Sequence, residues 1–99
     1  MLNIEEAKKE LRKKTYDEIQ VETAWKWASR AAASFENVLK MDREDKVSAF
    51  VVAQEYLHEA VEHASLAEDP SLVLDVKNEV DAYVYRAIDD ITESLGINL

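Results

Sequence analysis

The stretch VETAWKWASRAAASFENV, residues 21–38, decides the fold class. Its small and apolar residues recur at intervals of three and four, the spacing that gathers side chains on one face of an α-helix. The spacing predicts a helix of about seven turns from Thr15 to about Met41. Trp25 and Ala32 widen its apolar face on one side. That face consists of Val21, Ala24, Ala28, Ala31, Phe35 and Val38.

A second helix is predicted from Asp42 to the EDPS segment, residues 68–71. Asp42 can cap its start, and Glu44 and Asp45 place negative charge on its first turn, where the helix dipole favours acids. The spacing again predicts an apolar face. It contains Val47, Phe50, Val51, Gln54, Leu57, Val61 and Ala64.

A third helix is predicted to follow at once and to end at Leu95. Asp69 is placed to cap it and Pro70 stands at its first position, where the missing N–H of proline costs nothing. Gly96 is expected to end the helix in the left-handed conformation, with Ile97 folding back onto Ile91. Its apolar positions are Val73, Val76, Val80, Val84, Ala87, Ile91 and Leu95.

The remaining N-terminal segment, about Asn3–Lys14, has the apolar spacing of a short helix, with Asn3 as its cap. The sequence TYDE, residues 15–18, repeats the capping pattern, which favours a bend at Thr15. One glycine and one proline in 99 residues leave few turns for a sheet protein. The sequence therefore predicts an all-α, up-down-up bundle of three long helices with a short N-terminal helical arm. It forms a single domain over residues 1–99.

Charge excludes some partners. With 21 acidic and 12 basic residues the net charge is -9, so the chain cannot present the broad basic surface that nucleic acid requires. Residues 1–14 differ from the rest, because they hold five bases and three acids. This basic N-terminal arm is expected either to lie on an acidic body, its own or a neighbour's, or to remain a solvated helix start.

Other features bear on the compartment and on the chemistry. The chain has no cysteine, which excludes a disulfide framework, a thiolate metal site and a cysteine nucleophile. Its first ten residues lack the layout of a signal peptide, and no apolar run is long enough to span a membrane. We therefore expect a cytoplasmic protein with no membrane partner. No glycine-rich phosphate loop or nucleophile elbow supports phosphoryl or acyl transfer.

The segment VAQEYLHEAVEHA, residues 52–64, holds the candidate site residues. On a helix, Glu55, His58 and Glu62 stand at i, i+3 and i+7 and so share one stripe beside the apolar face. Glu59 and His63 form a second pair that is expected to face solvent. A Glu-x-x-His pair lets a carboxylate and an imidazole from consecutive turns bind one metal ion, such as iron or manganese.

Residues 22–63 resemble the first half of a ferritin-like or rubrerythrin-like domain, in which one helix supplies a Glu and the next a Glu-x-x-His. The matching positions are Glu22, Glu55 and His58. Residues 65–99 contain no histidine, so one chain holds half a site. The resemblance to encapsulated ferritins implies that two chains complete the ligand set. Glu55 would then bridge or chelate, His58 would be a terminal ligand, Glu22 an opposing carboxylate, and Glu62 a further ligand or an acceptor that orients the histidine.

Two alternatives stay open. The apolar stripes on all three helices are wider than three helices can cover, which predicts a homo-oligomer, a dimer or higher, with or without metal. In the metal-free case the acidic stretch is simply a solvated face. The pairs Glu59 and Glu62, then Asn78 and Asp81, resemble the magnesium motif of MazG-type nucleotide pyrophosphohydrolases. Asn78 stands where that motif has an acid.

Overall fold

The computed structural model describes residues 3–96, without the side chains of residues 9–14. These residues form α1 (Ile4–Val38), the short 3-10 helix η1 (Arg43–Asp45), α2 (Lys46–Leu66) and α3 (Leu72–Leu95). No strand occurs within residues 3–96. The predicted all-α class is confirmed.

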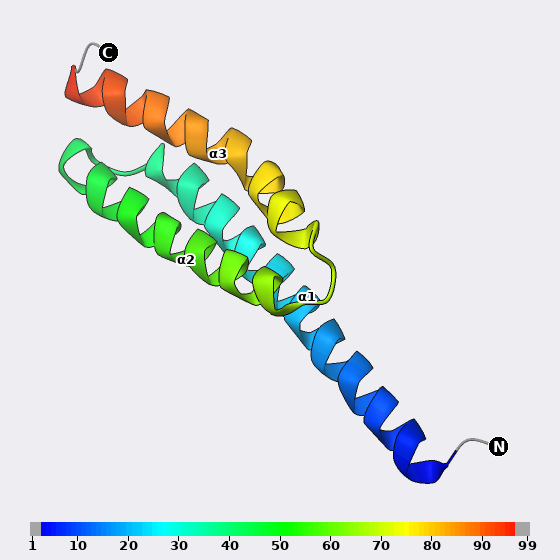
Figure 1. Ribbon diagram of the computed structural model, residues 1–99. Coiled ribbons are helices and arrows are strands. Elements are labelled where there is room, and N and C mark those ends of the chain that lie inside the picture. Colours follow the sequence, from blue (N-terminus) through cyan, green and yellow to red (C-terminus); the bar gives the residue numbers. More distant parts are fainter. Residues whose placement is uncertain (1–2, 97–99) are drawn as a thin grey trace.

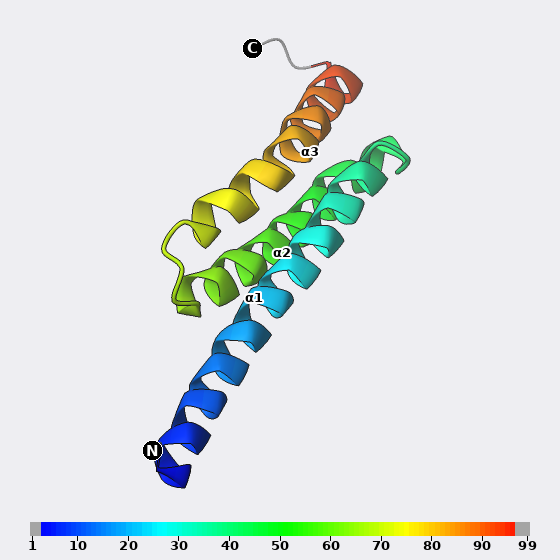
Figure 2. The ribbon, with the colours of Figure 1, turned by 90° about the vertical axis from the view of Figure 1, so that its right-hand side faces the viewer.

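The chain reverses direction twice (Figure 1), so α2 runs back beside α1 and α3 runs forward again. The same arrangement is seen after a quarter turn (Figure 2). Two aromatic pairs join α1 to α2. The ring centroids of Trp27 and Tyr56 are 5.6 Å apart, and those of Phe35 and Phe50 are 5.3 Å apart in an edge-to-face arrangement.

The core is narrow and built largely from alanine. Five of the six apolar positions predicted on α1 are fully or almost fully buried, and Val21 packs against them. Short side chains let helix backbones approach closely, and the few large buried residues fill the space that remains. The largest fully buried side chains are Phe35, Val38, Val76 and Val80.

The predicted apolar face of α2 is wrong in part. Val47, Val51 and Gln54 are exposed, whereas the buried residues of this helix are Lys46, Ala53, Ala60 and Ala64. Small side chains at such buried positions let helix backbones approach closely, whereas a β-branched side chain would hold them apart. The helix is thus rotated relative to the face that hydropathy alone predicts.

Lys46 can be buried because its ammonium group has three hydrogen-bond acceptors. Its Nζ donates to the carbonyl oxygens of Val38 at 2.9 Å and Leu39 at 3.3 Å. It also donates to Oδ2 of Asp90 on α3 at 2.7 Å. The final carbonyls of a helix have no partner within the helix. The lysine therefore caps the end of α1 and ties that end to α3.

The predicted bend at Thr15 is wrong, because α1 is one helix of 35 residues. The capping pattern of TYDE competes with continuous helix, and no glycine or proline interrupts the segment. Where the other helices end, α1 continues alone (Figure 1). Oδ1 of Asp17 accepts the backbone N–H of Glu68 at 2.6 Å, which marks this level. We call Ile4–Tyr16 the projecting segment.

The projecting segment makes the molecule elongated. The radius of gyration is 18.2 Å, against about 13 Å for a compact domain of 100 residues. In both views this part of α1 points away from α2 and α3 (Figures 1 and 2). The predicted basic arm therefore does not lie on the body of its own chain.

The helix caps agree in part with the sequence. The side chain of Asn3 accepts the N–H of Glu5 at 3.1 Å, and Gly96 adopts the left-handed conformation with φ 67°. The side chain of Asp42 makes no capping bond, and η1 precedes α2 instead. Asp69 accepts both the backbone N–H and the hydroxyl of Ser71 just before α3. The expected contact of Ile97 lies outside the described residues.

Candidate functional site

Two contacts fix the register of α1 against α2. Oε1 of Gln20 lies 2.7 Å from Nδ1 of His63, and the ring of Trp27 packs against the ring of Tyr56. In both pairs the residue numbers sum to 83. Residue n of α1 therefore lies level with about residue 83 − n of α2. This register shows which candidate ligands one chain can bring together.

Glu22 is not brought to Glu55 within one chain. It is level with about residue 61 of α2, six residues from Glu55, or roughly 9 Å along the helix. It also follows Gln20, which faces α2, by two residues, or roughly 200° around α1. Glu22 is exposed on the side of α1 that faces away from α2.

The other three candidates lie on the outer side of α2. Glu55, His58 and Glu62 are all exposed. Nε2 of His58 is 2.9 Å from Oε1 of Glu62, and these side chains are 70% and 58% exposed. An exposed pair of this kind contributes little to stability. Its geometry agrees with Glu62 as the acceptor that orients the histidine.

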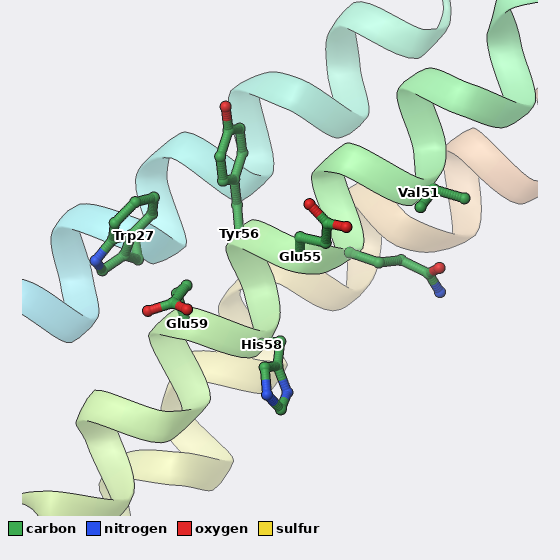
Figure 3. Close-up of a pocket in the computed structure, with 7 residues that line it drawn as sticks. Trp27, Val51, Glu55, Tyr56, His58 and Glu59 are labelled. Atoms are coloured by element: carbon green, nitrogen blue, oxygen red, sulfur yellow. The ribbon is translucent and has the colours of Figure 1, made fainter.

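Glu55 and His58 border an open depression of about 640 Å³ on the outer side of α2 (Figure 3). Tyr56 extends from α2 toward α1, where Trp27 lies, and His58 extends to the opposite side. The carboxylate of Glu55 does not point toward His58 in this view. The remaining lining residues are Val51, Gln54 and Glu59.

Within residues 3–96 no group of three or more His, Asp or Glu side chains is placed to hold a metal ion. One chain alone therefore does not fit the iron or manganese site. The two-chain site stays a prediction, because its ligands would meet only when a second α2 or α1 approaches the exposed side of this helix.

His63 was expected to face solvent, and the structure corrects this. Its side chain is 29% exposed and lies between α1 and α2. The amide oxygen of Gln20 can only accept, so the Nδ1–H of His63 donates to it across the two helices. Nε2 of His63 is 3.9 Å from Oε2 of Glu59. No local sequence pattern marks this contact, because Gln20 and His63 are 43 residues apart.

The MazG-like arrangement gains no support from the geometry. Glu59 lies beside His63, which faces α1, whereas Asn78 and Asp81 are on α3. Glu62 pairs with His58 on the exposed side of α2. The four residues do not form a ligand cluster among residues 3–96.

A second hollow, missed by sequence reasoning, lies between α1 and α3 and has a volume of about 380 Å³. Its floor is made of small residues, Ala28, Ser29, Ala32 and Ala33. Trp25 and Tyr83 supply the bulky lining side chains, and Glu36 and Glu79 add two exposed carboxylates. We call this hollow the α1–α3 groove.

None of the described helices combines the length and the apolar character needed to cross a membrane. No protein-family model, curated protein or solved structure matches the chain. The ferritin-like resemblance thus stays a prediction from Glu22, Glu55 and His58.

Proposed function

We propose that this chain is a self-associating helical protein, in which a second copy completes an up-down-up bundle of three long helices. The observation that carries the proposal is the set of large apolar side chains left exposed on every long helix. It includes Ile4, Tyr16 and Ile19 on α1, Val47, Val51 and Val52 on α2, and Leu74, Tyr85 and Ile88 on α3.

Some of these side chains lie at the same level on neighbouring helices. The Lys46–Asp90 pair aligns the start of α2 with the last part of α3. Val47 and Val51 are therefore at about the height of Tyr85 and Ile88. All four are at least 37% exposed. Burial of apolar surface contributes about 25 cal/mol per Å², so covering such side chains favours association.

Sedimentation velocity from about 1 to about 100 μM tests the proposal. The expected result is a species of twice the chain mass or more, with dissociation on dilution. A monomer across the whole range would overturn the proposal.

A carboxylate and histidine metal site between two chains is the second candidate. It is favoured by one observation: Glu55, His58 and Glu62 all lie on the exposed side of α2, where another chain can reach them. Anaerobic titration with iron and with manganese tests it. About one ion per chain is expected, with binding lost in the Glu55→Ala/His58→Ala double variant. Equal binding by Glu55→Ala/His58→Ala and the unmodified protein would overturn this candidate.

A further inference from the structure

We propose that the projecting segment of one chain docks in the α1–α3 groove of a second copy, which docks its own segment in return. The two α1 helices then run antiparallel along this contact. The inference rests on the proposed self-association and names the surfaces that make it.

The first argument is the continuity of one helical face. Spacings of three and four connect Val21, Trp25, Ala28 and Ala32, which pack in the core or line the α1–α3 groove. The same spacing, continued toward the N-terminus, places Ala7 and Ile4 on this face.

Within the projecting segment this face has no covering helix among residues 3–96. The contact between Asp17 and Glu68 marks the end of the three-helix part, and α1 continues beyond it (Figure 1). Ile4 is accordingly 71% exposed. An isolated helix of about 13 residues is marginal in water without packing. A second helix surface would supply that packing.

The second argument is length. The projecting segment, Ile4–Tyr16, spans roughly 20 Å, and the groove residues of α1 from Trp25 to Glu36 span roughly 17 Å. An antiparallel pairing that sets Ala7 beside Ala33 of the second copy lays the projecting segment of one chain along the groove residues of the other. It also places the three-helix part of each copy beside the projecting segment of the other, so the two can dock at once.

The third argument is chemical complementarity. The alanine and serine floor of the groove allows a helix to approach closely, as small residues do at helix–helix contacts. Glu79 places a carboxylate on the α3 side of the groove, and residues 1–14 carry five bases against three acids. Glu36 is level with Ile4 in this pairing, next to Glu5 and Glu6, and adds no attraction. Opposite charges steer such an encounter and fix its orientation.

Cross-linking tests the proposed register, because the chain has no cysteine. An isotope-labelled Ala7→Cys variant is mixed with an unlabelled Ala33→Cys variant and oxidised with diamide, and disulfide-linked pairs are counted by mass spectrometry. Mixed pairs are expected to exceed, by about tenfold, those formed by Ala7→Cys with Ser48→Cys. Ser48 is a matched control, since it is exposed on α2.

A second measurement does not depend on the register. Ile4→Glu is expected to raise the dissociation constant of the homo-oligomer at least tenfold, because a charge would enter an apolar contact. Circular dichroism of the Ile4→Glu variant checks that the helices remain.

The outcomes separate the two proposals. If the unmodified protein is oligomeric but mixed pairs stay at the Ser48→Cys level and Ile4→Glu binds normally, docking of the projecting segment is refuted and self-association stands. If the unmodified protein is a monomer at about 100 μM, both are refuted.

Discussion

Replacing Lys46 with methionine will lower the free energy of unfolding by about 2–3 kcal/mol, mainly because the end of α1 and Asp90 lose a charged donor. Methionine keeps most of the apolar stem and removes only the ammonium group. The carbonyl of Val38, a residue with no exposed surface, loses the ammonium donor at 2.9 Å and keeps the backbone N–H of Met41 at 3.2 Å. The side chain of Asp90 loses a partner at 2.7 Å but is 27% exposed, so water replaces part of that interaction.

Urea unfolding followed by far-ultraviolet circular dichroism measures the effect, at one fixed protein concentration because association shifts apparent stability. Lys40→Met is the matched control. Lys40 is exposed, and its replacement should change stability by no more than about 0.5 kcal/mol. Asp90→Asn should cost about 1 kcal/mol, since it removes the charge but leaves an acceptor. If Lys46→Met were as stable as Lys40→Met, the account of Lys46 as the cap of α1 would be refuted.

Three further predictions concern stability. Phe35→Ala should cost about 3–5 kcal/mol in the same assay, because Phe35 is fully buried against Phe50 and its removal leaves a cavity. Gln20→Leu should cost about 1 kcal/mol by removing the partner of His63, and a smaller loss than for an exposed Gln54→Leu control would contradict that bond. Hydrogen bonds from Ser71 hold the pKa of Asp69 below its ordinary value of 3.8, so ionised Asp69 stabilises the start of α3. This contribution is present above about pH 4 and is lost as pH falls through the lowered pKa, so Asp69→Asn should flatten the acid side of the stability profile.

The sequence predicts much of α1 because its pattern is redundant. From Val21 to Val38 small and apolar residues recur at helical spacing over about five turns, and five of the six predicted positions are buried. The end of α3 at Gly96 follows from local capping chemistry, which a single sequence contains. These features need no knowledge of what packs against them. The predicted start at Pro70 is wrong, because α3 begins at Leu72 with Ser71 as its N-cap.

The face of α2 could not be predicted in the same way. Hydropathy places the valines at 47 and 51 in the core, but the structure buries Ala53 and Ala60 and leaves both valines exposed. Burial of Lys46 depends on carbonyls of α1 and on Asp90, which is 44 residues away. The predicted bend at Thr15 is wrong for the opposite reason. The local capping pattern favours an interruption, but the helical propensity of the surrounding residues keeps α1 continuous.

In the candidate site, too, local contacts could be predicted from the sequence and contacts between helices could not. The i, i+4 pair of His58 and Glu62 is local and the structure shows it, at 2.9 Å. The position of Glu22 depends on the register of two helices, which sets it level with about residue 61 of α2 and not with Glu55. The bond between Gln20 and His63 depends on that same register.

The two kinds of partner held by Lys46 also set an order of assembly. Val38 is eight residues away along the chain, so this contact can form as soon as α1 and α2 close into a hairpin. Asp90 is 44 residues away and can join only when α3 arrives. Contacts between distant parts of a chain form late, because their loops cost more entropy to close. We therefore expect α3 to dock last in folding and to be released first in unfolding, so replacing Asp90 should speed unfolding more than it slows folding.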